Sequence, residues 1–419
     1  MDQAHPAPVG DKLRVGIVGG SIAGCSAAIA LSRAGHQVTV YERSTGELTG
    51  RGAGIGTPTA VIEDLIEQDY IDADMPHFKV ESIPHIGRTN ARETMGYVPW
   101  AVPVTIELLN WGDLYRNLRK RVPDEIYHKG YHVTGAEVNG DQTITLKLAG
   151  VDQATFDLVL FADGYRSIGR ELVCDASLLS YRGYVLWRGV LPESELADSE
   201  PLEGLLNRVG YPEGHGVFYF VPGDDGSIEP GERWVNWAIY VRVPEGKLAE
   251  FLVDRNGVQH SGSLPPGSMR PEVETQLKAL VRNYFPPYHS AIVDSSHDTF
   301  AQPIYIAEVS SYAKQRMCLM GDAGAVAQPF TAGGVFKGMN NALDLAKVLA
   351  EKGDVDLALA EWSATETATG KRLTVLGRQL EKALIWNVPD FALMDEPKMR
   401  DWWAIAAKMP EDLFASSEE

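Results

Sequence analysis

Stretches with the pattern of strands and of helices alternate along the N-terminal part of the chain. An apolar run at 15–18 predicts a short buried strand, and the alanine-rich stretch 27–34 that follows is suited to a helix. A second apolar run at 37–41 predicts another strand, and a helix is expected over 58–68. Strands that alternate with helices are typical of an α/β unit with a parallel sheet.

The composition shifts to strand formers from about residue 181 to residue 240. Strands are expected at 184–190, 216–221 and 233–240, and 76–108 has a pattern of strands and turns. Such a series predicts an antiparallel sheet in a second domain. Side chains alternate between the two faces of a strand, so each strand should present a defined set of side chains to one face. These sets are Tyr184, Leu186 and Arg188 in one strand, and Trp234, Asn236 and Tyr240 in another.

The remaining segments have shorter or weaker patterns. A hairpin is expected over 131–148, with Asn139-Gly140 as its turn, and a strand over 298–307 is expected to return the chain to the first domain. Two more buried strands are expected, each ending in a turn that pairs an aspartate with a glycine. These are 156–162 before Asp163-Gly164, and 316–320 before Gly321-Asp322. Further helices are expected at 111–122, at 271–283, from Gly334 onward and at 356–387.

Composition and charge restrict the classes of partner. The 419 residues carry a formal net charge of −19, which disfavours binding to nucleic acid or to an anionic membrane. Three widely spaced cysteines indicate neither a disulfide framework nor a metal site. The first twelve residues lack the pattern of a signal peptide, and no apolar run approaches the length of a membrane helix. A cytoplasmic protein is expected, and the sequence leaves open whether it forms a homodimer.

The first glycine-rich turn lies between a predicted strand and a predicted helix. Gly19, Gly20 and Gly24 would let backbone N–H groups approach a pyrophosphate at the positive end of the helix. Ser21 stands where the dinucleotide-binding pattern has its second glycine. Glu42 ends the second strand, at the distance where an acidic side chain binds a ribose hydroxyl. A dinucleotide site is therefore predicted, with a tight turn in an ordinary α/β protein as the alternative.

Three turns in this order, Gly19–Gly24, Asp163-Gly164 and Gly321-Asp322, resemble those of the FAD-dependent aromatic hydroxylases with a single FAD-binding domain. The resemblance covers roughly residues 13 to 350. It implies that the first turn holds the FAD pyrophosphate and that Asp322 binds the ribityl chain. The segment 162–167, followed by Arg170, matches a stretch that the family associates with both FAD and the nicotinamide donor. The helix that starts at Gly333-Gly334 would face the isoalloxazine ring, where a helix N-terminus stabilises the negative charge of the reduced flavin.

The resemblance extends to a branch that hydroxylates dihydroxypyridines. That branch also has serine for the second glycine, and it is similar to this chain at 183–189 and at Pro329 with Ala332-Gly333-Gly334. Two positions differ from the wider family. Trp111 stands where many relatives carry arginine, and Thr331-Ala332-Gly333 replaces a Gly-Gln-Gly motif near the flavin. The cofactor-binding residues expected from the resemblance are Gly19, Gly20, Ser21, Ile22, Ala23, Gly24, Glu42, Arg43, Arg51, Gly54, Ile55, Asp163, Gly164, Gly321, Asp322, Ala332, Gly333 and Gly334.

The fold expected from pattern and resemblance together is mixed α/β. A Rossmann-like FAD-binding domain would comprise 13–75, 107–178 and 300–355, and an inserted antiparallel-sheet domain for substrate would comprise 76–106 and 179–299. Residues 356–419 would form C-terminal helices and a Trp-rich tail.

The candidates on the substrate side depend on weaker signals. Arg188 would bind an oxyanion or carboxylate, with a surface ion pair as the alternative. His215 would serve as an acid or base, with a polar loop histidine as the favoured alternative. Phe218, Tyr219 and Phe220 would stack on a ring or belong to the sheet core. Gln328 and Pro329 would lie near the flavin. The candidate catalytic residues are therefore Arg188, His215, Gln328 and Pro329, and the candidate substrate-binding residues are Tyr184, Arg188, Phe218, Phe220, Asn236 and Pro329.

The resemblance implies hydroxylation of an electron-rich aromatic or N-heteroaromatic ring, such as a hydroxypyridine, with NADH or NADPH and O2, through a flavin C4a-hydroperoxide. No second glycine fingerprint for NAD(P)H is visible, which fits transient binding of the donor. The alternatives are Baeyer–Villiger oxygenation or halogenation on the same fold, a nicotinamide-only dehydrogenase, and a non-catalytic FAD-binding carrier or regulator. The Trp-x-Trp-x-Ile-Pro segment typical of halogenases is absent from the sequence.

Overall fold

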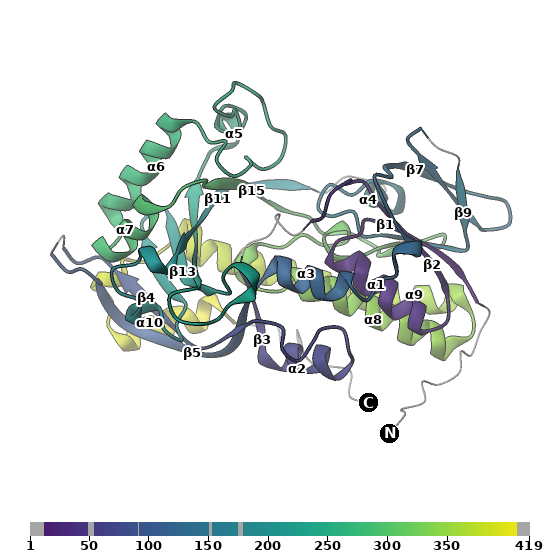
Figure 1. The fold of residues 1–419 in the computed structure, drawn as a ribbon, viewed down its shortest axis with the longest axis horizontal. Helices are drawn as coiled ribbons and strands as arrows, with labels where there is room; N and C mark the ends of the chain where they lie inside the picture. Colours follow the sequence, from purple (N-terminus) through teal and green to yellow (C-terminus); the bar gives the residue numbers. More distant parts are fainter. Residues whose placement is uncertain (1–11, 49–53, 91, 151–152, 175–178, 409–419) are drawn as a thin grey trace.

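A computed structural model describes residues 12–48, 54–90, 92–150, 153–174 and 179–408. Figure 1 shows two sheet-based parts side by side, with β1 and β2 in one and β11 and β13 in the other. Among the described residues, no helix combines the length and apolar character needed to cross a bilayer.

The first part is built on a six-stranded sheet with the order β16-β17-β10-β1-β2-β6. Its pairs are parallel except for the short hairpin β16–β17, as the alternating pattern predicted. The strands are β1 (Arg14–Val18), β2 (Gln37–Glu42), β6 (Tyr127–Lys129), β10 (Leu158–Phe161), β16 (Ala313–Lys314) and β17 (Met317–Leu319). The helices of this part are α1 (Ile22–Arg33), α3 (Trp111–Arg119), α4 (Ile168–Val173) and α8 (Gly334–Lys352).

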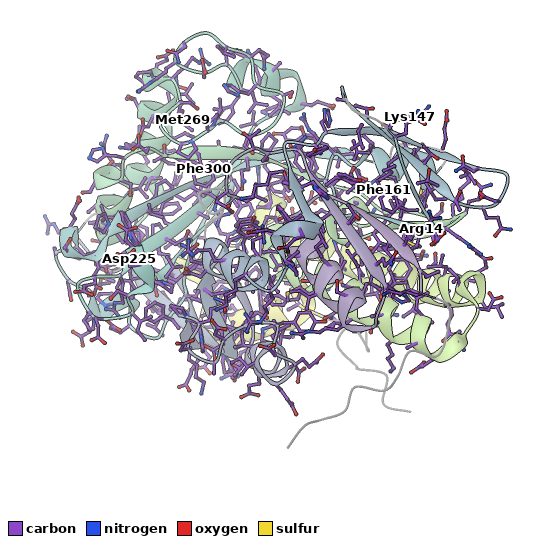
Figure 2. The ribbon with its side chains drawn as sticks, turned by 45° about the vertical axis from the view of Figure 1, so that its right-hand side comes forward. Arg14, Lys147, Phe161, Asp225, Met269 and Phe300 are labelled. Atoms are coloured by element: carbon purple, nitrogen blue, oxygen red, sulfur yellow. The ribbon has the colours of Figure 1, made fainter. Side chains whose placement is uncertain are left out.

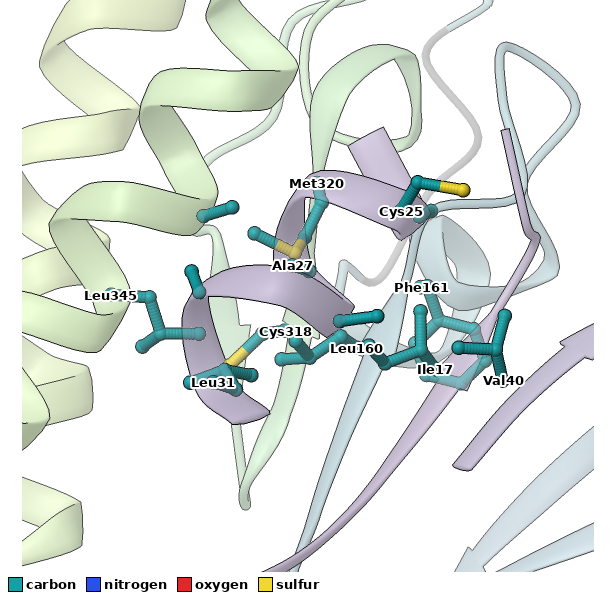
Figure 3. Close-up of a cluster of buried hydrophobic side chains, with 14 of the residues drawn as sticks. Ile17, Cys25, Ala27, Leu31, Val40, Leu160, Phe161, Cys318, Met320 and Leu345 are labelled. Atoms are coloured by element: carbon teal, nitrogen blue, oxygen red, sulfur yellow. The ribbon is translucent and has the colours of Figure 1, made fainter. Parts of the chain in front are cut away.

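The core of this part lies between the parallel strands and the helices α1 and α8. Figure 3 shows Ile17, Val40, Leu160 and Cys318 from four neighbouring strands, with Leu31 of α1 beside Cys318. All five side chains are fully buried. Because parallel strands covered on both faces bury nearly every side chain, the short apolar runs of the sequence were sufficient to locate them.

The second part is built on an eight-stranded sheet with the order β15-β11-β14-β13-β12-β4-β5-β3. Its pairs are antiparallel except for β12 with β4. The strands are β3 (Gly54–Pro58), β4 (Phe78–Gly87), β5 (Tyr97–Asn110), β11 (Ser180–Pro192), β12 (Asn207–Tyr211), β13 (Gly214–Val221), β14 (Trp234–Arg242) and β15 (Phe300–Ile306). The predicted antiparallel sheet is confirmed, and β12 is an additional strand of it.

The two faces of the eight-stranded sheet are covered differently. On one face, α6 (Pro271–Tyr284) and α7 (Pro287–Ser295) bury an apolar cluster that includes Trp187, Phe218 and Trp237. The other face carries Tyr184, Arg188 and their same-face neighbours, and we call it the site face. It meets the segment Lys382–Trp386 at the end of α9 (Val355–Glu381), and α10 (Glu396–Ala406) packs near its β4–β5 side. The remaining helices are α2 (Thr59–Glu67) and α5 (Glu245–Phe251).

Three local predictions need correction. The strand expected over 156–162 is divided at Asp157, whose carboxylate binds Arg14, so that β9 (Ala154–Phe156) belongs to a separate three-stranded sheet with β7 (Val133–Val138) and β8 (Ile144–Leu148). The hairpin β7–β8 is confirmed, but its loop is longer than the Asn139-Gly140 turn, because the N–H of Asn139 donates to the carbonyl of Thr143. The strand β15 pairs with β11, so the chain returns to the six-stranded sheet only at β16.

Candidate active site

The glycines of the first turn have no space for a side chain. Gly19 has a φ of +98°, and a Cβ there would lie 2.4 Å from the carbonyl oxygen of Ala162. A Cβ on Gly24 would lie 1.9 Å from the carbonyl oxygen of Gly19. No side chain of the described residues caps the start of α1, so the backbone N–H groups of its first turn are open to a ligand there. This arrangement fits an anionic pyrophosphate at the positive end of the helix.

Glu42 lies beside this turn and is buried. One carboxylate oxygen accepts a hydrogen bond from the N–H of Gly20 at 2.9 Å, and the other accepts one from the N–H of Ser44 at 2.8 Å. The side chain therefore supports the turn itself, a role that the sequence did not indicate. Arg43 is exposed, and Arg51 lies outside the described residues.

Tyr127 completes the turn from a distance of 107 residues along the chain. Its hydroxyl donates to the carbonyl of Gly20 at 2.8 Å, and a Cβ on Gly20 would lie 2.2 Å from that hydroxyl oxygen. The guanidinium of Arg119 covers the ring at 4.0 Å. Sequence reasoning missed Tyr127, because nothing in its local pattern connects strand β6 to the glycine turn.

A buried arginine joins the second and third turns. Arg170 donates hydrogen bonds to the carbonyls of Tyr165 at 2.7 Å, Asp322 at 2.5 Å and Ala323 at 3.0 Å. Asp163 accepts a hydrogen bond from the N–H of Ile168 at 2.8 Å, and burial raises the pKa of its carboxyl. The structure thus brings the two motifs together through the buried residue Arg170.

The third turn places Asp322 where it is accessible. Gly321 has a φ of +57°, and its N–H donates to the side-chain oxygen of Asn341 at 2.9 Å. The Asp322 side chain is 47% exposed, and the buried amine of Lys337 lies 3.3 Å from one of its carboxylate oxygens. Burial lowers the pKa of Lys337, while Asp322 opposes that shift. An accessible carboxylate with a buried lysine beside it could accept a hydrogen bond from a ribityl hydroxyl.

Asn341 is held in turn by Glu366 of α9. Its amide donates to a Glu366 carboxyl oxygen at 2.6 Å. Burial, followed by the neighbouring carboxyl of Asp344, raises the pKa of Glu366 to about 8. This carboxyl therefore keeps its proton at neutral pH.

The raised pKa of Glu366 predicts a specific pH dependence of stability. Below pH 4.5 the carboxyl is protonated in both states, whereas between about pH 4.5 and 8 only the unfolded state releases its proton, so the free energy of unfolding should fall as the pH rises. In Glu366→Gln this decline should be smaller, because the amide cannot ionise. The check is Tm across pH 5 to 8, with the exposed Glu361→Gln on the same helix as control. An equal decline in Glu366→Gln would contradict the shift.

The start of α8 and the segment before it form an open platform. Pro329, Ala332 and Gly334 are exposed, and Ala332 has a φ of +55°. Gly333 is the N-cap residue of α8, no side chain caps the helix, and a Cβ on Gly334 would meet no atom within 4 Å. Free N–H groups and open space at a helix N-terminus fit the electron-rich edge of a flavin. With the first turn and Asp322, the residues present therefore fit FAD.

Strand β3 places Gly54 on the site face of the larger sheet. Its N–H donates to the side-chain oxygen of Asn236 at 3.1 Å, and its carbonyl accepts from Arg188 at 3.1 Å. A Cβ on Gly54 would lie 2.6 Å from the ring of Tyr219. The structure therefore brings Arg188 and Asn236 together around one backbone unit, beside the partly exposed Ile55. Arg188 forms no surface ion pair among the described residues.

His215 is buried in β13, so the favoured interpretation as a polar loop histidine is wrong. Its Nδ1 donates to the carbonyl of Leu384 at 3.1 Å, and its ring stacks on Tyr240 at 4.6 Å. Burial, followed by the charge of Arg208, lowers the pKa of His215 to about 3. The imidazole is therefore neutral, and its Nε2, which has no partner among the described residues, is a hydrogen-bond acceptor.

Two of the aromatic candidates lie on the opposite face of the sheet. Phe218 packs against His289 at 4.9 Å, and Phe220 lies under the guanidinium of Arg233 at 4.0 Å. Both belong to the cluster covered by α6 and α7, so their prediction as substrate-binding residues is wrong. Tyr219, between them in the sequence, is on the site face. Because 217–221 is apolar throughout, the pattern did not reveal which side chains point to which face.

Gln328 is buried beside Tyr184 and is held by a residue that sequence reasoning missed. Its amide donates to Glu381, which also accepts from Arg182 at 3.0 Å and from the indole of Trp386 at 2.8 Å. The Gln328 side-chain oxygen and the Tyr184 hydroxyl have no hydrogen-bond partner in the described part of the chain. Both side chains are fully buried.

A cavity of about 760 Å³ lies where the end of β11 meets the start of β15. It borders Phe300, which is the direct cross-strand neighbour of Arg188, together with Val190 and Trp234. Figure 2 shows Phe300 in the part of the molecule that contains this sheet, away from Phe161 of the six-stranded sheet. Arg188 itself is not among the residues that line this cavity.

Comparison with known proteins gives two kinds of match. Residues 17–63 match the family model "NAD(P)-binding Rossmann-like domain", and residues 181–305 match "FAD binding domain-like". The 2,6-dihydroxypyridine 3-monooxygenase of Paenarthrobacter nicotinovorans is 28% identical over 85% of this chain and 88% of its own length. The 6-hydroxynicotinate 3-monooxygenase of Bordetella bronchiseptica is 23% identical over 83% of this chain and 86% of its own.

Solved structures agree with these matches. The 2,6-dihydroxypyridine-3-hydroxylase from Arthrobacter nicotinovorans superposes with a TM-score of 0.81 at 27% identity, over 90% of this chain and 93% of the other. A salicylate hydroxylase, at 16% identity and a TM-score of 0.73 over 95% and 94%, shares the fold. The predicted fold class and the predicted resemblance are confirmed.

Proposed function

We propose that this chain, an FAD-dependent monooxygenase related to 2,6-dihydroxypyridine 3-hydroxylase, hydroxylates an electron-rich aromatic or N-heteroaromatic ring such as a hydroxypyridine. NADH or NADPH would supply the electrons and O2 the oxygen atom. We further propose that the part containing the six-stranded sheet holds FAD and that the eight-stranded sheet binds the ring.

One observation supports this function above the others. The uncapped start of α8 and the exposed Asp322 form an open platform, and the nearby site face carries polar atoms without partners, on Tyr184, Arg188 and Asn236. Buried polar atoms without partners are rare in proteins, so a cluster of them beside open space favours a polar ligand.

FAD, when bound, supplies the activation of O2. The chain's own residues then have three tasks. Arg188 and Asn236 would orient the hydroxylated ring. The neutral His215 would accept a hydrogen bond from an O–H or N–H group of the ring through Nε2. The ring of Phe330, whose centroid lies 6.1 Å from that of His215, would help to exclude water.

The function is tested with purified protein. We expect the protein to bind FAD. In a panel of hydroxypyridines, phenols and aromatic acids, we expect at least one ring to stimulate NAD(P)H oxidation and to give a hydroxylated product. An oxygen atom inserted beside a carbonyl, or a halogenated product, would instead support the related chemistries. Protein that takes up FAD but whose NAD(P)H oxidation no ring stimulates would be a carrier.

Arg188→Met should raise the KM for the ring by about tenfold or more, because a charged hydrogen bond contributes about 1.5–3 kcal/mol. Arg188→Lys should restore part of the affinity. Steady-state kinetics with the best substrate of the panel measure the effect. An unaltered KM would indicate that Arg188 does not bind the ring and only donates its hydrogen bond to the carbonyl of Gly54.

A further inference from the structure

Arg208 of β12 is a buried arginine that has no carboxylate partner in the part of the chain that the structure describes. It is 7% exposed, and no described residue forms an ion pair with it. Its Nη1 donates to Nε2 of His85 at 3.2 Å, and its Nε has no acceptor among the described residues. By contrast, the similarly buried Arg233 binds both Glu193 and Glu203.

The described residues around Arg208 supply no negative charge. Burial, followed by the charge of Arg208, lowers the pKa of His85 well below its ordinary value, so this histidine is neutral. The ring of Trp403 in α10 lies 4.9 Å from the guanidinium. Burial lowers the pKa of Arg208 to about 10, which still leaves it protonated at neutral pH. A buried cation without an anion is costly, and a charged ligand would offset that cost.

The register of the sheet places Arg208 in one row with Arg188. Arg188 is directly opposite Ala238, Ala238 is opposite Val217, and Val217 is opposite Arg208. Three strand spacings separate the backbones of the two arginines by about 14 Å. The two residues between them are small.

The middle of this row consists of Ala238 and Val217. Val217 has a strand on either side, yet it is partly exposed, and Ala238 beside it projects only a methyl group. The groups bordering the row include the unpartnered Asn236 Nδ2 and His215 Nε2, one a donor and the other an acceptor. A flat ring above Ala238 and Val217 would therefore meet a guanidinium on either side and neutral polar groups between.

On the basis of the hydroxylase function proposed above, we propose that Arg208 binds an anionic oxygen of the aromatic substrate, a carboxylate or an ionised ring hydroxyl. Arg208 thereby selects anionic rings over neutral ones. The opposite edge of the ring is bound by Arg188, so the two arginines set the direction in which the ring lies in the site.

The test compares three rings on the holoenzyme. The flavin absorbance is followed while wild-type protein and Arg208→Met are titrated with 6-hydroxynicotinate, 2,6-dihydroxypyridine and neutral 2-hydroxypyridine. In Arg208→Met the Kd of at least one anionic ring should rise by about tenfold or more, while that of 2-hydroxypyridine changes by less than about twofold. The anionic ring that responds distinguishes a carboxylate from an ionised hydroxyl.

A second measurement separates recognition from a structural role. Removal of an uncompensated buried charge should leave the Tm of the ligand-free protein unchanged or raise it, whereas loss of a structural contact would lower it. Arg208→Lys, which keeps the charge, should regain part of the discrimination. If Arg208→Met does not retain flavin, Arg208→Gln keeps hydrogen-bond donors and serves in its place.

The outcomes separate this inference from the function on which it rests. Equal losses for neutral and anionic rings, or no loss for any ring, would overturn the role of Arg208 even if the wild-type enzyme hydroxylates the rings. Wild-type protein that neither binds nor hydroxylates any of the three rings would contradict both proposals.

Discussion

Replacement of Arg170 by methionine is expected to lower the free energy of unfolding by about 3 kcal/mol or more and to abolish retention of FAD. The variant keeps most of the side-chain volume but leaves the carbonyls of Tyr165, Asp322 and Ala323 without their donor. Each buried polar group left without a partner costs about 1–3 kcal/mol. Because two of these carbonyls belong to the third turn, the variant should also no longer hold Asp322 in its position.

Chemical denaturation and the ratio of flavin to protein absorbance measure the two effects. Arg282→Met is the matched control, because Arg282 is exposed and binds one carboxylate, that of Asp294, so it should change stability by about 1 kcal/mol at most. If Arg170→Met keeps both its flavin and its stability, the three carbonyls have found other donors and Arg170 does not join the motifs.

Replacement of Gly334 by alanine should separate the fold from the cofactor site. A methyl group there meets no protein atom within 4 Å, so the free energy of unfolding of the apoprotein should stay within about 1 kcal/mol of wild type. The same methyl group lies where the flavin is proposed to approach α8. Overpacking costs about 1–3 kcal/mol, which corresponds to a rise in the Kd of FAD of about five- to 150-fold.

Titration of the apoprotein by flavin fluorescence, together with thermal unfolding, tests this separation. In Gly24→Ala both the FAD affinity and the Tm should fall, because the added Cβ would lie 1.9 Å from the carbonyl of Gly19. In Gly246→Ala, in the first turn of α5 with open space around it, neither should change. A normal FAD affinity in Gly334→Ala would place the flavin away from α8.

The candidate site was predictable where the signal is local. The turns at Gly19–Gly24, Asp163-Gly164 and Gly321-Asp322 are each a short stretch that follows a buried strand, and the structure gathers them along the same edge of the six-stranded sheet. The face shared by Tyr184, Leu186 and Arg188 was also correct, because alternation along one strand depends only on the backbone geometry.

The supporting residues were not predictable, since they act over long distances in the sequence. Tyr127 and Glu381 each hold a turn or a side chain from a distant element. The burial of His215 depends on the segment around Leu384, which follows it by 169 residues. A single sequence without structure contains no signal for such pairs.

The sequence by itself therefore determined the α/β class, the order of most helices and strands and the three turns that carry the resemblance to FAD-dependent monooxygenases. Local backbone preferences and the burial of apolar runs encode all of these. Only the tertiary structure decided that Phe218 and Phe220 face away from the site and that Arg208 stands in one row with Arg188. Those facts depend on strand register and on which helices cover each face, and both are set by packing across the whole chain.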